Sequence, residues 1–159
     1  MITRNNLTAT ATEREIVMTR VFNAPRELIF NAYTDPNLIP QWWGLKRLMT
    51  TVVKMEVRPG GIWRFVQRGS DGNEYVFNGM YHEIVPSGRL VYAFEFAAAP
   101  SHVWLKTVTF EEEHDGKTKL TDKVLFQTVE DHDMMLKSGV QEGVAESMDR
   151  LPEHLAKEV

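Results

Sequence analysis

Two carboxylates stand at positions where a β-strand would turn them towards an apolar core. Asp122 lies between Leu120 and Val124 at a spacing of two, and Glu83 shares the phase of Tyr81. Alternate residues of a strand face the same side of a sheet. A carboxylate removed from water has a raised pKa and can act as an acid or a base. The alternative is that bulges or strand ends bring both carboxylates to water, or that an arginine pairs with them.

Other groups with acid–base chemistry are scattered along the chain. His102 and Tyr81 complete the set of candidate acids and bases, and the remaining histidines form no cluster. The chain has no cysteine, which excludes thiol nucleophiles, disulfides and zinc–thiolate sites. It also has no nucleophile-elbow, P-loop, metalloprotease or dinucleotide-binding motif. We therefore expect no assigned catalytic residue, no metal and no cofactor, and we favour binding over catalysis.

The segments that would position these groups show the two-residue period of β-strands. Leu90, Tyr92, Phe94 and Phe96 give the clearest alternation, and Val53 begins an earlier one. In the segment 75–85 the period leaves two choices, because Phe77 and Tyr81 share one phase while Met80 and Ile84 share the other. Turns are predicted at 59–61, 71–72, 86–88 and 115–116. Strands are expected at 13–22, from 50, around 63–65, at 75–85, 90–96 and 102–112, and at 120–126.

Helical spacing appears near both ends of the chain. Pro25 suits the first position of a helix over 25–34, and a short second helix ends at Trp42 and Trp43, before Gly44. After residue 129, apolar residues recur every three or four positions, which predicts one helix of about 20 to 25 residues. Pro152 should kink or end this helix near Arg150.

Together these elements predict an α+β protein. Consecutive hairpins require an antiparallel sheet, and the long C-terminal helix is the element large enough to cover its apolar face. We expect a curved sheet of six to seven strands around that helix, with two short helices after the first strand. Residues 1–12 are predicted to be a flexible lead-in, and residues 13–159 to be a single domain.

A strongly curved sheet cannot pack flat against a helix, so an apolar pocket is expected between them. Gly139 and Gly143 weaken the helix, which suggests that a strand or a ligand approaches it closely. Of the adjacent tryptophans, one should pack inwards and the other should cover a loop or the pocket entrance. The residues expected to line the pocket are Trp42, Trp43, Trp63, Phe65, Phe77, Tyr81, Tyr92, Phe94, Trp104, Phe110, Asp122, Met135, Val140 and Val144.

Charge and hydropathy exclude several classes of partner. The net charge of −4 argues against general affinity for nucleic acid, which requires a basic face. No apolar run is long enough for a membrane-spanning helix, and the N-terminus lacks the apolar core of a signal peptide. We expect a cytoplasmic protein. The expected partner is a small hydrophobic molecule. A contact with a chaperone and the formation of a homodimer are left open.

An ordered series of short motifs runs through residues 13–155. The motifs are Asn23-Ala24-Pro25, Thr34-Asp35-Pro36, Trp42-Trp43-Gly44, Arg58-Pro59-Gly60-Gly61, Trp63-Arg64-Phe65, Gly79-Met80-Tyr81, Val108-Thr109-Phe110 and Gly139-Val140-Gln141-Glu142-Gly143. This series resembles the START-like superfamily, also called SRPBCC, whose fold is the helix-grip fold. More closely, it resembles the branch of homologues of the activator of the heat-shock-protein-ninety ATPase, in which a large aromatic often stands at the position of Val144.

The resemblance implies the helix-grip fold and a cavity for apolar molecules, but it carries no catalytic set. The leading hypothesis is a binding protein for a small hydrophobic ligand such as a lipid, with a stress-related role. The second is a cyclase or hydrolase acting on an aromatic or polyketide-like substrate, which needs an inward acid or base. The third is a co-chaperone-like regulator, which needs an exposed apolar patch that Trp42 or Trp43 could provide.

Overall fold

The fold is built on one antiparallel sheet. A computed structural model describes residues 2–4, 7–11, 13–138 and 140–157. Within these residues nine strands pair in the order β1-β2-β3-β9-β8-β7-β6-β5-β4. The strands are β1 (Ile2–Arg4), β2 (Leu7–Ala11), β3 (Glu15–Phe22), β4 (Met49–Met55), β5 (Ile62–Arg68), β6 (Glu74–Val85), β7 (Arg89–Phe96), β8 (Val103–Glu112) and β9 (Thr118–Leu125).

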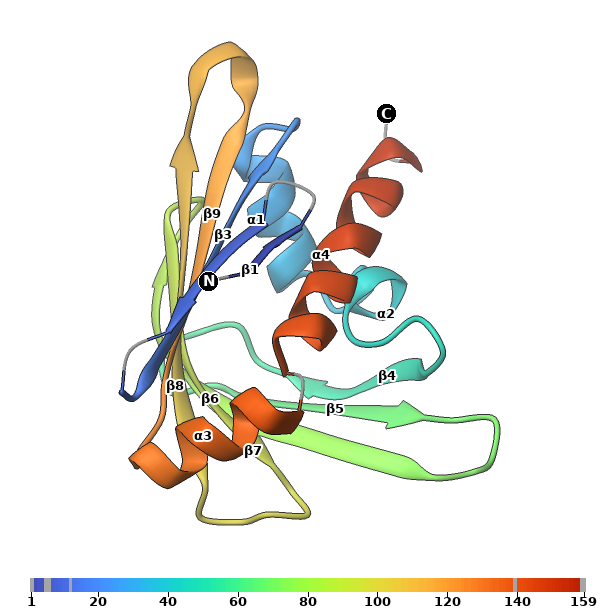
Figure 1. Cartoon of the computed structure of the whole chain (residues 1–159). Helices are drawn as coiled ribbons and strands as arrows, with labels where there is room; N and C mark the ends of the chain where they lie inside the picture. The colour runs from blue at the N-terminus through green and yellow to red at the C-terminus, as the bar shows by residue number, and fades with distance from the viewer. Residues whose placement is uncertain (1, 5–6, 12, 139, 158–159) are drawn as a thin grey trace.

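The helices gather on the concave face of this sheet (Figure 1). Helix α4 (Val140–Lys157) contacts α1 (Arg26–Thr34), α2 (Ile39–Trp42) and α3 (Val129–Ser138), and α1 contacts β8. A single 3₁₀ turn, η1 (His114–Gly116), joins β8 to β9. The α+β helix-grip prediction is confirmed, including the two short helices that follow β3.

The N-terminal segment differs from the prediction of a flexible lead-in. Strand β2 pairs along β3, β1 pairs with β2, and Leu7 and Ala9 are buried in the core. These two strands raise the sheet from the predicted seven strands to nine. Leu7, Ala9 and Ala11 alternate with threonines, but alanine is a weak strand former, and the strands form by hydrogen bonding to the edge of β3.

Two β-bulges reset the side-chain phase of the sheet. One lies between Val52 and Lys54, so that Val53 points to solvent although its alternation with Met55 predicted a shared face. The other lies between Tyr81 and Glu83 in β6. Phe77 and Tyr81 therefore face inwards before this bulge, and Ile84 packs against the core after it. A bulge adds one residue to one strand and so exchanges the two faces.

The predicted turns are present and place residues in the left-handed region of backbone space. These residues are Gly60, Gly72, Ser87, Asp115 and Gly116. Glycine adopts positive φ without a steric cost, which explains its use at three of these five positions.

The C-terminal segment forms two helices where one was predicted. Helix α3 ends at Ser138, and α4 begins at Val140 with a different direction (Figure 1). Of the two effects expected of Pro152, a kink or an end of the helix near Arg150, the end is wrong, because α4 continues through Pro152 to Lys157. The apolar stripe runs through both helices, and for this reason periodicity did not separate them.

Candidate functional site

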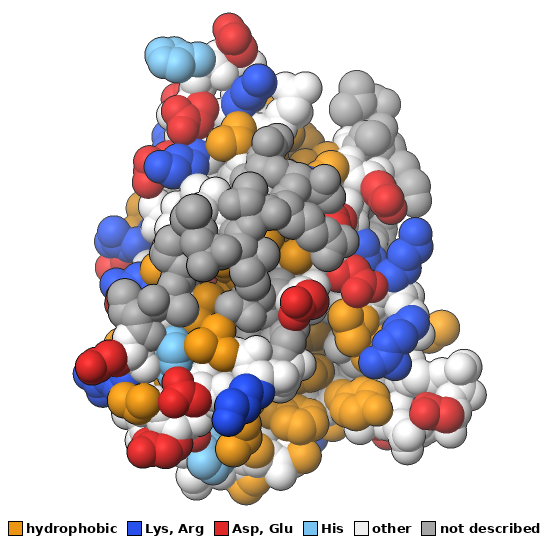
Figure 2. Space-filling view, in the orientation of Figure 1, with side chains coloured by type: hydrophobic (Ala, Val, Ile, Leu, Met, Phe, Trp, Pro, Cys, Tyr) orange, Lys and Arg blue, Asp and Glu red, His pale blue; other side chains and the backbone are white. Residues whose placement is uncertain are grey.

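A cavity of about 360 Å³ lies between the concave face of the sheet and the first turns of α4. Its volume falls within the range of small-molecule sites, roughly 300–1,000 Å³. Its walls come from α1, α2, the loop after α2, the sheet and α4. Hydrophobic side chains reach the surface in Figure 2 where α3, the start of α4 and β5 approach one another in Figure 1.

Eight of the fourteen residues predicted to line the pocket do line this cavity. Trp63, Phe65 and Tyr81 instead border a neighbouring space of about 20 Å³. Phe110 is fully buried in the core, and Met135 packs against the core without reaching the cavity. The side chain of Val140 lies outside the described residues. The eight lining residues are Trp42, Trp43, Phe77, Tyr92, Phe94, Trp104, Asp122 and Val144.

The two adjacent tryptophans occupy different positions: one packs inwards, as predicted, whereas the other, expected over a loop or at the pocket entrance, lines the cavity. Trp42 is 2 % exposed, and its Nε1 donates a hydrogen bond of 2.9 Å to the carbonyl of Ala32. Trp43 forms a wall of the cavity, where its ring meets Phe65 and Phe77 edge-on at centroid distances of 5.1 and 5.5 Å. Aromatic rings give a wall large area and a defined shape.

Residues 41–44, here called the tryptophan loop, are held by polar contacts with α4. The Gly44 amide donates to Ser147 Oγ at 2.9 Å, and Arg150 donates to the carbonyls of Gln41, Trp43 and Gly44. These carbonyls follow the end of α2, where helical acceptors are left without intrahelical partners. Arg150 thus ties the wall of the cavity to the helix that covers it.

Gly143 opens the helical side of the cavity. It lines the cavity, and a Cβ built on it would meet no atom within 4 Å. Of the two alternatives left open, a strand or a ligand, the close approach of a strand is therefore wrong at Gly143. Gly139, the other glycine of the pair, lies outside the described residues.

A buried ion pair occupies the strand side of the cavity. Lys106 Nζ lies 3.1 Å from Asp122 Oδ2, and the two side chains are 11 and 3 % exposed. Tyr92 stands directly across from Lys106 in the β7–β8 register, and its hydroxyl accepts a hydrogen bond from the Lys106 ammonium. Asp122 is therefore inward, as its phase predicted, and it has a cationic partner.

These neighbours change the protonation behaviour of the site. Burial opposes the charge of Lys106, but the Asp122 carboxylate and the Tyr92 hydroxyl outweigh it and raise the pKa of Lys106 above its usual value. Burial, and then the charge of Asp122, raises the pKa of Tyr33. Burial also raises the pKa of Tyr92. At neutral pH the site therefore holds a lysinium and protonated phenols, and none of these is a ready base.

Comparison with known proteins places the chain in a family. The model of the family described as "Activator of Hsp90 ATPase homolog 1-like protein" (AHSA1) matches residues 23–156. The chain belongs to this AHSA1-like family. The match spans α1 to α4 and includes every described residue of the cavity.

Solved structures share this AHSA1-like fold. Protein Ms6760 from Mycobacterium smegmatis is 25 % identical, with a TM-score of 0.82 over 92 % of this chain and 95 % of that one. A Rhodobacter sphaeroides protein is 24 % identical, with a TM-score of 0.87 over 95 and 98 %. The AHSA1 protein of Silicibacter pomeroyi is 20 % identical, with a TM-score of 0.75 over 91 and 99 %. The search of curated proteins finds no match.

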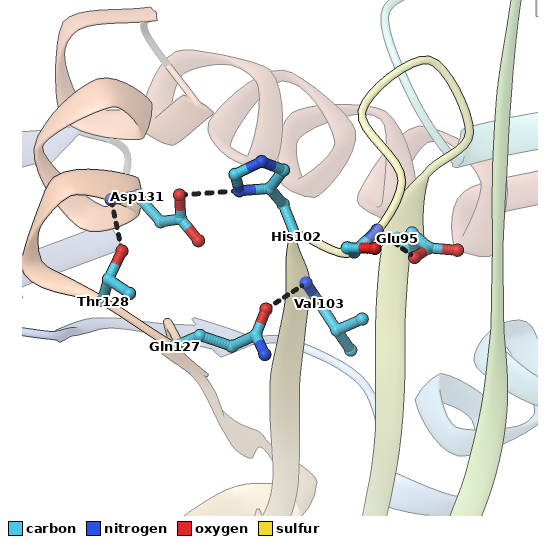
Figure 3. A network of polar contacts seen from close by, with 7 residues as sticks. Glu95, His102, Val103, Gln127, Thr128 and Asp131 are labelled. Carbon is cyan, nitrogen blue, oxygen red and sulfur yellow. Dashed lines mark hydrogen bonds and ion pairs between the residues drawn. The ribbon is translucent and has the colours of Figure 1, made fainter.

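The other candidate acids and bases of this AHSA1-like chain lie away from the cavity. Glu83 is 47 % exposed and pairs with Arg89, because the β6 bulge turns it outwards. His102 is 55 % exposed, and its Nδ1 lies 2.8 Å from Asp131 Oδ1 at the start of α3 (Figure 3). Tyr81 borders only the smaller space, and burial raises its pKa. Asp122 is the only one of the four candidates that reaches the cavity.

Sequence reasoning missed Lys106, although a signal for it existed. Lys106 shares the phase of Trp104, Val108 and Phe110 in β8, all of which face inwards. A lysine is by default assigned to solvent, because lysines are rarely buried unless they are paired. Tyr33 was missed as a lining residue too, although it lies on the predicted apolar face of α1.

Three further observations concern metal binding, membrane-spanning helices and exposed apolar surface. Among the described residues, no group of three or more histidines and carboxylates is placed to hold a metal ion. No helix in the described part of the chain is long and apolar enough to cross a membrane. Neither Trp42 nor Trp43 forms the exposed apolar patch that the co-chaperone hypothesis needs, since one is buried and the other packs against the aromatic wall.

Proposed function

We propose that this protein binds a small hydrophobic molecule in the cavity between the sheet and α4. The observation that carries the proposal is a volume of about 360 Å³ whose surface is mainly apolar and includes the rings of Trp43, Phe77 and Phe94. Burial of apolar ligand surface against such walls supplies roughly 25 cal/mol per Å². Gly143 supports the same role. A glycine inside a helix lowers the stability of the protein, and no neighbouring atom packs against Gly143 to offset this loss, so the space beside it suits a bound molecule.

The charges in the cavity support binding over turnover. Lys106 and Asp122 neutralise each other, and the raised pKa of Lys106 removes it as a base at neutral pH. A catalytic acid or base needs a pKa near the working pH. The resemblance to the AHSA1-like family leads us to expect binding of an apolar molecule, but the proposal rests on the cavity of this protein.

The experiment is a thermal-shift screen of neutral apolar compounds against the wild type and Gly143→Phe. A phenylalanine at 143 would project into the cavity, because its Cβ meets no atom within 4 Å. A ligand at one hundred times its Kd should stabilise the wild type by about 2.7 kcal/mol and leave the filled variant unchanged. Equal shifts in both proteins, or no shift with any compound, would overturn the proposal.

A further inference from the structure

The Tyr33 hydroxyl is a hydrogen-bond donor without an acceptor at the wall of the cavity. The residue is 9 % exposed and lines the cavity, and its hydroxyl makes no hydrogen bond among the described residues. The polar side-chain atoms of these residues that are both unpartnered and closed to solvent do not include the Tyr33 oxygen, so this oxygen keeps accessible surface. A buried donor left unpaired costs free energy that a bound acceptor can recover.

Two observations direct this hydroxyl towards the cavity. The Tyr33 ring packs against the rings of Trp42 and Phe110, at centroid distances of 4.6 and 5.3 Å, and these contacts fix the direction of the side chain. Burial is the largest cause of the raised pKa of Tyr33, and the charge of Asp122 is the next. Asp122 lines the cavity but not the smaller space that Tyr33 also borders, so the hydroxyl stands near the polar part of the cavity wall.

We infer that the ligand is an uncharged hydrophobic molecule with a carbonyl oxygen, and that this oxygen accepts a hydrogen bond from the Tyr33 hydroxyl. The inference rests on the proposed function and names the chemical class that the cavity takes. A carbonyl oxygen offers lone pairs and no hydrogen, and therefore matches a site that lacks an acceptor. Because the pKa of Tyr33 is raised, its hydroxyl keeps the hydrogen at neutral pH.

The charged residues of the cavity favour a neutral acceptor over an ion. One lysine, Lys106, and two carboxylates, Asp122 and Glu142, line the cavity. Lys106 is paired with Asp122, and Glu142 is exposed in the first turn of α4. An anionic acceptor would meet two carboxylates and a lysine that is already paired. A cationic group would be drawn to Glu142, but it would remain in water there and would offer Tyr33 no acceptor.

The apolar walls favour a ring-bearing body next to this carbonyl. Phe94 and Trp104 stack with a centroid distance of 5.0 Å and an interplanar angle of 9°, and both line the cavity. Trp43 lies on the α2 side, with its ring centroid 6.4 Å from that of Phe94. Aromatic rings pack on such surfaces in stacked or edge-on arrangements. The matching class is the aromatic ketones and related ring-bearing carbonyl compounds.

Two probes that differ in one acceptor atom test the inference. 2-Acetylnaphthalene carries a carbonyl oxygen, and 2-isopropenylnaphthalene has a methylene group of similar size in its place. Because the two compounds differ in hydrophobicity, the quantity compared is the ratio of their affinities, measured by calorimetric titration of each full-length variant at neutral pH. Tyr33→Phe should lower the ratio of ketone to alkene affinity about fivefold, the size expected for a net hydrogen bond between neutral groups. Tyr81→Phe, which removes a phenol hydroxyl outside the cavity, should keep the wild-type ratio.

The stability of the free protein gives a second readout, which needs no probe. A hydroxyl without a partner adds no hydrogen bond to the folded state, so Tyr33→Phe should unfold at the same urea concentration as the wild type or at a higher one. A marked loss of stability would show that the hydroxyl already has an acceptor inside the protein, and would overturn the inference.

The outcomes separate the inference from the proposed function. Equal affinity ratios in the wild type and Tyr33→Phe would overturn the carbonyl inference, and the cavity proposal would stand if Gly143→Phe weakened the binding of both probes. Absence of binding by both probes, or undiminished binding by Gly143→Phe, would count against the cavity proposal and the inference together.

Discussion

Lys106 and Asp122 face each other diagonally across β8 and β9, with 3.1 Å between Nζ and Oδ2, on the wall of a cavity whose surface is mainly apolar. The register pairs Asp122 with Val108, two residues beyond Lys106, so both side chains emerge on the concave face. An ion pair this deeply buried loses hydration that its mutual attraction must offset. Both residues are also among those that line the cavity.

Removal of one partner of this pair should cost much more than removal of both. Asp122→Leu leaves the Lys106 ammonium buried without its counter-ion, and the free energy of unfolding should fall by about 3–5 kcal/mol. The double variant Lys106→Met, Asp122→Leu should lie closer to the wild type than either single variant. Urea unfolding of the four proteins measures this coupling. Additive losses in the double variant would show that the two charges do not depend on each other.

The protein should lose stability in alkaline solution. The pKa values of Lys106, Tyr33, Tyr81 and Tyr92 are all raised in the folded state. A raised folded pKa means that the native state holds protons more tightly, so this stability is complete below the unfolded pKa of about 10 and is lost above it. Unfolding measured between about pH 8 and pH 11 should show this fall, and tyrosinate absorbance should appear together with unfolding. Stability that stays constant over this range would contradict the protonation states assigned here.

Gly143→Ala should stabilise the free protein. The added methyl group meets no atom within 4 Å, and alanine is favoured over glycine in a helix by about 1 kcal/mol. Thermal or urea unfolding measures the gain. A destabilised Gly143→Ala would mean that the helix lies closer to the sheet than the structure places it. Its matched partner is Gly143→Phe, which fills the cavity.

Gly44→Ala should destabilise the tryptophan loop more than a simple turn substitution does. Gly44 has a φ of +85°, and a Cβ built there would overlap the side-chain amide of Gln67, which donates to Thr50 Oγ1. Gly72→Ala is the control, because Gly72 has a φ of +87° with open space around it. Both variants bear the backbone strain of about 1–3 kcal/mol. The Gly44 variant should lose about 1 kcal/mol more in urea unfolding, and equal losses would refute the packing argument.

The strands of the sheet could be predicted wherever alternation was unbroken. Leu90, Phe94, Val108 and Leu120 all lie on the buried face, as a period of two requires. Bulges were considered as an alternative, but their positions could not be predicted, because an inserted residue such as Val53 is of a type that regular strands also contain. They reversed the face of every residue that followed, and this reversal placed Glu83 in solvent.

The cavity wall was predicted more completely than its polar residues. Trp43, Phe77 and Phe94 were all predicted as lining residues and do line the cavity, and of these only Phe94 was indicated by a strict alternation. The burial of Lys106 was not predicted, because Asp122, the partner that permits it, lies on another strand. Single-sequence patterns do not report contacts across strands, so pairing of this kind requires the register. The same limit hid the two N-terminal strands, whose order depends on β3.

The most direct test of a ligand-binding cavity is native mass spectrometry of the wild type and Gly143→Phe, each purified gently from the organism that produces the protein. The account predicts a discrete excess mass on the wild type, lost on denaturation and absent from the variant whose cavity is filled. The same excess mass on both proteins, or a bare mass for the wild type after exposure to apolar extracts of those cells, would contradict the account.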